Sequence, residues 1–485
     1  MVIPTVDHDC ELKDIVVELA NKLAKVEHEL ALIKKAHVGP KTERSKMPRI
    51  DAGKKATAEE KLAKRRERAR LKAEIQTVRT EHKVPAAERV CPACGNDKLR
   101  PLGKGNITTV WEFVPATFIK HEHVQETLRC KCNGYVVTAP GAPKVIEGGR
   151  YGASFLAHLV VCKCADHLPL YRLEKDFARQ GIPIARSTMT DLTHRVSSMT
   201  KPIWTALLDT IRVRRVVQAD ETRMRMLDDG TGKPRNGFMW TFVAADENGD
   251  LDVAIVFAAN RSGETPRRIL EGTSGYLLVD GYSGYNDVAN VSTRKRAACH
   301  AHLRRYFHDA LATSPIAQEA MELIGELYGV EHEAARRSLS GNSKLEFRKL
   351  NAPPIRDRLR QWLEAQRRKQ LPKSPIGAAI RYGLNNWDEL GRFLDDAGIP
   401  LDNNNSEAAL RRVALGRKNY LFVGDVASGI NIAGLYTLIA TCEARRINPF
   451  AYLADVITRL KDVDIEDPAA IVPLLPAAWL RARPA

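Results

Sequence analysis

The sequence predicts a multidomain α+β protein, and three observations lead to this prediction. A length of 485 residues is enough for two to four domains. A hydrophobic content of 44% is that of a globular protein. Residues 151–200 have a helical pattern, residues 212–310 mix strand and helix patterns, and residues 408–462 are helical again.

The mixed region predicts the core of a domain at residues 206–430. An apolar strand leads to Asp220, a hairpin follows at 238–257, and a helix then precedes a strand that ends before Asp280. Three antiparallel strands, a helix and a further strand are the order of a ribonuclease-H-like α/β sheet. We therefore expect that fold, with a helical insertion at about 311–400.

Three acidic residues stand where an acid is costly unless it has a function. Asp220 and Asp280 follow apolar runs, and Glu407 opens a helix whose next residues on the same face are apolar. In the expected sheet the strands of Asp220 and Asp280 are neighbours, and Glu407 joins them from a later helix. Clustered carboxylates repel each other, so such a cluster usually holds a hard divalent cation.

Two Mg²⁺ (or Mn²⁺) ions held by three carboxylates suit phosphoryl transfer by in-line displacement. Such metals lower the pKa of bound water, so no separate base is required. Glu221, next to Asp220, is expected to point to the opposite face of its strand and to have a supporting role. Asp402 is expected to cap the helix of Glu407 rather than to bind metal.

The formal net charge of +16 favours a polyanionic partner, most often a nucleic acid, over the alternative that the charge serves solubility alone. No apolar run approaches the roughly 18 residues of a membrane span. The first 11 residues do not resemble a signal peptide. We expect a cytoplasmic protein with no membrane partner.

Residues 10–35 carry a heptad pattern of apolar residues, which predicts a coiled coil and self-association as a dimer or larger oligomer. An amphipathic helix packed on its own chain is the alternative. Residues 36–85 form a basic linker or helix in which Lys64, Arg65 and Arg66 are candidates for phosphate contacts; a solvated helix face is the alternative.

Residues 86–148 contain four grouped cysteines and alternating apolar residues, which predicts a zinc-binding β-module. The proposed Zn²⁺ ligands are Cys91, Cys94, Cys130 and Cys132. The second pair is one residue shorter than the usual C-x-x-C, so His121 or His123 could replace one thiolate. A cluster of reduced thiols without metal is the alternative.

Residues 149–205 predict a helix from 166 to 180, a tight turn and a second helix, the order of a helix-turn-helix. Arg186, Ser187 and Thr188 at the start of the second helix are candidates for DNA contacts, although many helical connectors share this pattern. Residues 431–485 predict a helical region, with a loosely packed Pro-rich tail from Val463 onward.

Several motifs in order resemble the insertion sequence 66 family of bacterial transposases, over roughly residues 85–460. They are Ala219-Asp220-Glu221-Thr222, Asp280-Gly281-Tyr282, Cys299-x-Ala301-His302-x-Arg304-Arg305-x-Phe307, Asp402-Asn403-Asn404-x-x-Glu407-x-x-Leu410-Arg411 and Gly416-Arg417-Lys418-Asn419-Tyr420-Leu421-Phe422. Together such motifs are highly specific. The residues after Leu475 differ from the compact ending usual in the family.

The resemblance implies a DDE transposase in which Asp220, Asp280 and Glu407 are catalytic. Its partners would be double-stranded DNA, as terminal inverted repeats and target, and accessory proteins of the same element, in a nucleoid-associated setting. Cys299 and His302 form a C-x-x-H pair for which we favour a structural role over an approach to the active site. Candidate phosphate contacts are Arg304, Arg305, Arg411, Arg412, Arg417 and Lys418; Arg411 could equally pair with Glu407.

Two other functions remain open on the sequence alone. A transposase-derived protein that has lost catalysis could act as a DNA-binding repressor, although a binder gains nothing from a costly carboxylate cluster. A ribonuclease-H-like nuclease that cuts branched DNA or RNA hybrids is the second alternative, which the heptad pattern and the cysteine module disfavour.

Overall fold

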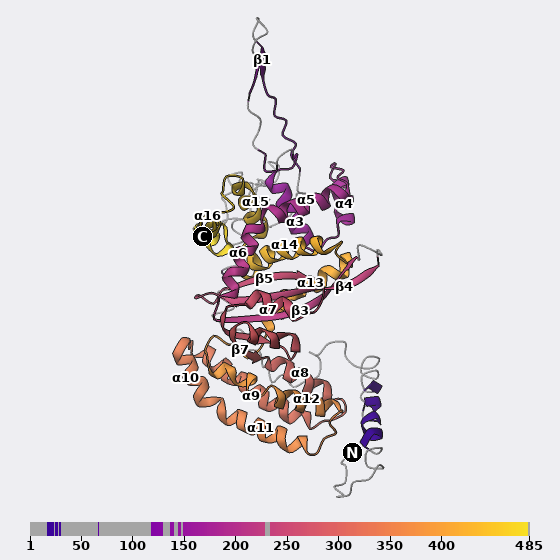
Figure 1. Ribbon diagram of the computed structural model, residues 1–485, viewed down its shortest axis with the longest axis vertical. Coiled ribbons are helices and arrows are strands. Elements are labelled where there is room, and N and C mark those ends of the chain that lie inside the picture. Colours follow the sequence, from indigo (N-terminus) through magenta and orange to yellow (C-terminus); the bar gives the residue numbers. More distant parts are fainter. Residues whose placement is uncertain are drawn as a thin grey trace, which may run out of the picture. The chain divides into compact units, whose positions relative to one another are not determined.

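A computed structural model shows the arrangement of most of the chain (Figure 1). The residues described are 17–23, 25–27, 29–30, 66, 118–129, 136–139, 144–146, 149–227 and 233–483. The chain divides into two compact units, of which Pro40–Ile119 is one. All helices and strands named below belong to the other unit.

The centre of this unit is a five-stranded mixed sheet with the order β5-β4-β3-β6-β7. Its strands are β3 (Val216–Leu227), β4 (Pro234–Ala245), β5 (Leu251–Ala258), β6 (Ser274–Val279) and β7 (Thr293–Ala298). Strands β3, β4 and β5 pair antiparallel, whereas β6 is parallel to β3 and β7 is parallel to β6. The predicted order of strands is therefore observed, with β3 central and β6 beside it.

Strand β3 is longer than the sequence predicted. The expected strand ended at Asp220, but β3 continues to Leu227 and remains paired with β4, where Leu227 lies opposite Pro234. Beyond Asp220, exposed Arg223 alternates with buried Met224. A continuous apolar run marks only the part of a strand that is buried on both faces. The strand predicted from this run was therefore too short.

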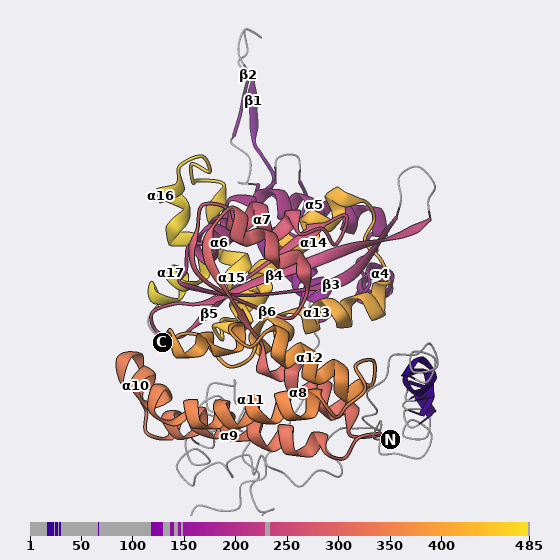
Figure 2. The ribbon, with the colours of Figure 1, turned by 60° about the horizontal axis from the view of Figure 1, so that its bottom comes forward.

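Helices cover both faces of the sheet (Figure 2). On one face, α6 (Lys201–Arg212), α7 (Glu264–Leu270) and the 3-10 helix η3 (Ser283–Asn290) share an apolar core with side chains of β3, β4 and β6. On the other face, Leu278 of β6 packs with residues of the helical segment that follows β7.

Residues 311–400 are helical, as predicted. The helices after β7 are α8 (His300–Ala310), α9 (Ala317–Arg336), α10 (Gly341–Asn351), α11 (Pro353–Arg367), α12 (Pro375–Asn385) and the 3-10 helix η4 (Glu389–Leu394). Helix α13 (Asn404–Tyr420) then returns to the sheet and packs on β3. The helical insertion thus lies between the second and third acids.

Helix α14 (Val426–Ala444) lies along the edge strand β5. The hydroxyl of Thr437 accepts from Ile255 N–H at 2.8 Å, and that of Thr441 accepts from Val253 N–H at 3.1 Å. Both hydroxyls also donate to carbonyls of the same strand residues. By length and composition α14 is the one described helix that could cross a membrane, which differs from the prediction, but it is mostly buried and serves as a core helix.

Residues 149–205 form α3 (Ala153–Cys164), α4 (Leu170–Arg179) and α5 (Arg186–Met199). The helix predicted from residue 166 begins at Leu170, because Pro169 stands before its first turn in an extended conformation. The turn between α4 and α5 contains Gly181 at φ 84°. Two helices joined by a short turn are thus present, and their contact with DNA stays a prediction.

The prediction of a loosely packed tail is wrong. After α15 (Pro449–Leu460), the prolines of the tail start short helices, since Pro is favoured in a first turn. Leu474 and Trp479 are buried. The Trp479 indole N–H donates to Asp455 at 2.8 Å, and the Tyr452 hydroxyl donates to Leu474 O at 2.8 Å.

Within the segment predicted as a coiled coil, the described residues 17–23, 25–27 and 29–30 are helical. Its apolar heptad residues are largely exposed: Leu19 by 59%, Leu23 by 46%, Val26 by 59% and Leu30 by 50%. Such a face suits a helix that meets a partner helix. The coiled coil itself stays a prediction.

Thr441→Val should lower the free energy of unfolding by about 1–3 kcal/mol, because it leaves buried backbone groups of β5 without their partner. Urea unfolding monitored by circular dichroism would measure the change. Thr458→Val is the matched control, since the exposed Thr458 hydroxyl bonds only to its own helix. Equal losses in the two variants would contradict a role for Thr441 in sealing the edge.

Candidate acidic active site

The pairing of β3 with β6 brings two of the three acids together. Gln218 lies opposite Leu278 in this parallel pair. Asp220 and Asp280 each follow this last pair of the ladder by two residues, and Asp280 comes directly after β6 ends. Since side chains alternate between the faces of a sheet, both carboxylates belong to the face of Leu278.

Glu407 approaches from a different element, in the first turn of α13. Its backbone N–H donates to Asn403 O at 3.2 Å. One carboxylate oxygen lies 3.4 Å from the Arg305 guanidinium, and the other lies 3.8 Å from Nε2 of His302. Both partners are on α8, so the helix after β7 faces the third acid.

The three acids influence one another electrostatically. Burial, followed by the negative charges of Glu221, Asp280 and Glu407, raises the pKa of Asp220 to about 7. The hydrogen bond from Glu221 N–H to Asp220, at 2.9 Å, acts in the opposite direction. A carboxyl group with so high a pKa favours a site in which added positive charge would stabilise its ionised form.

The described acids form no complete metal cage, although carboxylate oxygens are the ligands that a hard divalent cation prefers. Among the described residues, no group of three or more His, Cys, Asp or Glu side chains is arranged to hold one metal ion. Mg²⁺ keeps several waters and usually takes one or two carboxylates together with substrate phosphates, so such a cage is not required. Oε1 of Glu407 is buried and accepts no hydrogen bond within the described part of the chain, which leaves an oxygen suited to a cation.

Glu221 points away from this cluster, as expected for the next residue on a strand. Its carboxylate accepts from the Arg261 guanidinium at 2.8 Å and from the Tyr285 hydroxyl at 2.6 Å. Its side chain is only 1% exposed. Arg261 also stacks on Tyr282, 3.9 Å from the ring centroid. No sequence pattern predicts the roles of Arg261 and Tyr285, because their contacts with Glu221 join positions far apart in the chain.

The C-x-x-H residues have two different environments. Cys299 is buried at the start of α8, where its sulfur accepts from Asn403 N–H at 3.2 Å, and its structural role stays a prediction. His302 instead lies against Glu407, and burial lowers its pKa although Glu407 and Asp280 act in the opposite direction. The alternative of an approach to the acids therefore describes His302 better.

The residues around the start of α13 make hydrogen bonds within the fold. Asp402 accepts from Asn404 N–H at 3.2 Å and from the Tyr328 hydroxyl at 3.1 Å. Asn403 occupies the N-cap position, but its side chain makes no cap. Its amide instead donates to the carbonyl of Ala219 at 2.7 Å, next to Asp220.

The residues predicted to contact DNA differ in exposure and in the bonds that they already make within the fold. Exposed positions are Arg66, Arg186, Ser187, Arg304, Arg305, Arg411 and Lys418, and Thr188 is half-buried. Arg186 pairs with Glu174 at 3.0 Å, and Arg412 pairs with Glu443 at 2.5 Å. Arg417 donates to the Thr222 hydroxyl at 2.8 Å and to Arg223 O, so it braces α13 on β3.

Some predicted sites lie outside the described residues. These are the four cysteines Cys91, Cys94, Cys130 and Cys132, together with Lys64 and Arg65. The second cysteine pair falls between two short antiparallel strands, β1 (Thr127–Arg129) and β2 (Val136–Thr138). His121 and His123 are described and exposed.

Three family models match the chain in succession. The model for zinc-finger binding domain of transposase IS66 matches residues 88–133, that for Transposase IS66 family matches residues 148–430, and that for IS66 C-terminal element matches residues 437–481. The last match includes the packed tail, so the expected departure from the family's ending is also wrong.

Two curated relatives are similar in sequence to this chain over most of its length. Uncharacterized protein y4jD of Sinorhizobium fredii is 34% identical over 77% of this chain and 75% of its own length. Uncharacterized protein y4hP of the same organism is 30% identical over 81% of this chain and 74% of its own length. A mixed α/β domain with a zinc-finger-type module is the class that the matches define. The chain belongs to the IS66 family of transposases.

The raised pKa of Asp220 has a consequence for stability. In the metal-free protein this group keeps its proton up to about pH 7, whereas in the unfolded chain it ionises near 3.8. Stability contributed by the neutral carboxyl is therefore lost as pH rises between these values. At pH 8 the free energy of unfolding of Asp220→Asn should exceed that of the unsubstituted protein by a few kcal/mol, since each pKa unit corresponds to about 1.4 kcal/mol. Below pH 4 the two free energies should be nearly equal.

Urea unfolding in EDTA at several pH values would measure this difference. The matched control is Asp462→Asn, at an exposed position remote in sequence from the acids. A difference that does not change with pH would contradict the assignment of a raised pKa to Asp220.

Proposed function

We propose that this protein is an active DNA transposase that binds the terminal inverted repeats of its element, hydrolyses their 3′ ends and joins them to target DNA. The observation that carries the proposal is the parallel pairing of Gln218 with Leu278, two residues before Asp220 and Asp280, with Glu407 in the first turn of α13. Family membership supports a transposase role, and the chemistry below is our proposal.

The proposed catalytic domain is ribonuclease-H-like. The sheet supports this, since a central first strand pairs antiparallel on one side and parallel with the strand after a helix on the other. Asp220 and Asp280 would hold one Mg²⁺ or Mn²⁺ ion, and Glu407 would share in holding a second. When bound, the two ions supply an activated water or 3′-hydroxyl and stabilise the leaving oxygen.

The residues around the acids would orient DNA and keep the carboxylates in place. Arg305 lies beside Glu407 and, with Arg304, is exposed on α8, so these guanidinium groups would neutralise phosphates next to the scissile bond. Burial lowers the pKa of His302, so this side chain would be a neutral neighbour of Glu407 and would not compete with a metal ion for the carboxylate. The start of α5 and the exposed Lys418 would extend phosphate contacts away from the acids.

Assembly on DNA would need more than one chain. The exposed apolar residues of the N-terminal helix support self-association as a dimer or larger oligomer. The zinc-finger match supports a structural Zn²⁺ ion held by Cys91, Cys94, Cys130 and Cys132. Accessory proteins of the same element remain part of this proposal.

Incubation of the protein with DNA carrying the element's ends and Mg²⁺ tests the proposed reaction. The unsubstituted protein should produce 3′-hydroxyl ends and joined products, whereas Asp220→Ala should bind the DNA and lower cleavage at least about 10³-fold, because ion placement is lost. Asp462→Asn and DNA with scrambled ends are the controls. Binding without cleavage by all variants would indicate a repressor, and cleavage that ignores end sequence would indicate a nuclease.

Zinc content gives an independent test. Purified protein should contain about one zinc per chain by mass spectrometry of metals, and Cys91→Ser should lose it, because a structural site needs all four ligands. Cys10→Ser, outside the cysteine module, should keep it. Equal zinc content in the two variants would rule out Cys91 as a ligand.

A further inference from the structure

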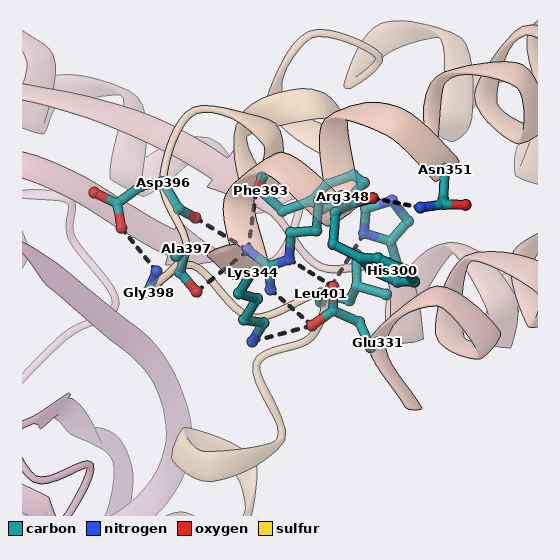
Figure 3. A network of polar contacts seen from close by, with 11 residues as sticks. His300, Glu331, Lys344, Arg348, Asn351, Phe393, Asp396, Ala397, Gly398 and Leu401 are labelled. Carbon is teal, nitrogen blue, oxygen red and sulfur yellow. Dashed lines mark hydrogen bonds and ion pairs between the residues drawn. The ribbon is translucent and has the colours of Figure 1, made fainter. Parts of the chain in front are cut away.

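The segment that joins the helical insertion to the third acid is held by buried polar side chains along its length. It runs from the end of η4 to the start of α13, residues 393–403, and we call it the strap. Figure 3 shows Arg348 of α10 and His300 of α8 bonded to its backbone, with Glu331 of α9 paired to Arg348. A loop with so many backbone contacts is fixed in one position.

Arg348 holds the beginning of the strap. It is on α10 and is fully buried, with 0% exposure. Its guanidinium donates to the carbonyls of Phe393 and Asp396 at 3.0 Å each and of Ala397 at 3.3 Å (Figure 3). Two further bonds, of 2.6 and 2.7 Å, go to the Glu331 carboxylate, so the buried charge is paired.

His300 holds the middle. Its backbone N–H donates to Leu401 O at 2.9 Å, and its Nδ1 lies 3.1 Å from the same oxygen. Burial, with a smaller effect of Arg356, lowers the pKa of His300 to about 3, so the ring is neutral and carries its proton where this carbonyl can accept it. The first residue of α8 is thereby tied to the strap.

Asn403 holds the end and connects the three elements that carry or flank the acids. It is fully buried. Its N–H donates to the Cys299 sulfur at 3.2 Å, and its side-chain amide donates to Ala219 O at 2.7 Å, one residue before Asp220. Its own carbonyl accepts from Glu407 N–H at 3.2 Å. Any displacement of Asn403 therefore moves the backbone of Glu407 relative to Asp220.

We propose that Arg348 and Asn403 are positioning residues that set the third carboxylate for metal binding, so that the helical insertion controls the geometry of the acids. This inference rests on the proposed metal site. Neither residue would touch metal or DNA. Residues that orient metal ligands from behind typically change metal affinity or activity 10- to 100-fold when replaced, and misplacement by about 1 Å is enough for such a loss.

Arg356 provides a matched control within the same insertion. It is half-buried, donates to the carbonyls of Leu390 and Trp387 at 2.8 and 3.1 Å, and stacks on the Trp387 ring. Its partners precede the strap, so its loss should affect stability without reaching Glu407.

The test compares Arg348→Met, Asn403→Ala and Arg356→Met in the full chain. Binding of Mn²⁺ without DNA, measured by electron paramagnetic resonance, should weaken 10- to 100-fold in the first two variants and less than 2-fold in the third. Hydrogen exchange in the first turn of α13 should be faster only in the first two. Binding of end DNA should stay within about 2-fold in all three.

Replacement variants and the Asp220→Ala variant separate the positioning role from the proposed metal site. If Arg348→Met or Asn403→Ala fails to fold, Arg348→Lys and Asn403→Ser replace them with the same expected order of effects. Equal Mn²⁺ affinities in the strap variants and Arg356→Met would overturn the positioning role alone. Mn²⁺ binding that is undetectable in the unsubstituted protein, or unchanged by Asp220→Ala, would instead overturn the proposed metal site.

Discussion

The parallel pairing of β3 with β6 is the constraint on which the acidic site depends. A slip of one residue would turn Asp280 to the opposite face of the sheet from Asp220. The register is fixed at the start of the pair, where Tyr276 N–H donates to Arg215 O at 2.7 Å. Gly275 makes this approach possible, since it has φ 111° and a Cβ there would lie 2.1 Å from that oxygen.

Among the described residues, a few arginines are buried and used inside the fold rather than at its surface. Arg294 is buried and donates to the carbonyls of Arg212, Arg214 and Tyr276, where strand and helix ends meet. Arg445 is likewise buried, between carboxylates of the β4–β5 hairpin. The net charge of +16 does not show where the cations lie, so exposed residues on α8 and α13 are more informative about a polyanion site than the total.

Local patterns predicted the elements well, because strand and helix periodicities follow from burial. The order of strands, the β4–β5 hairpin and the position of Glu407 in the first turn of a helix were all predictable in this way. The extension of β3 was not, since its outer half is exposed on one face. Long-range polar contacts such as Asn403 with Ala219 leave no periodic signal, and a proline-rich tail looks the same in sequence whether it packs or not.

The threonines of α14 have a consequence for how copies of this chain can meet. They occupy the outward backbone groups of β5 at Val253 and Ile255, so no strand from a second molecule can be added there. Two copies of this chain could therefore not merge their sheets through this edge. Copies that meet at this edge would have to join through helices such as α14, and such contacts can form and separate without breaking a backbone ladder.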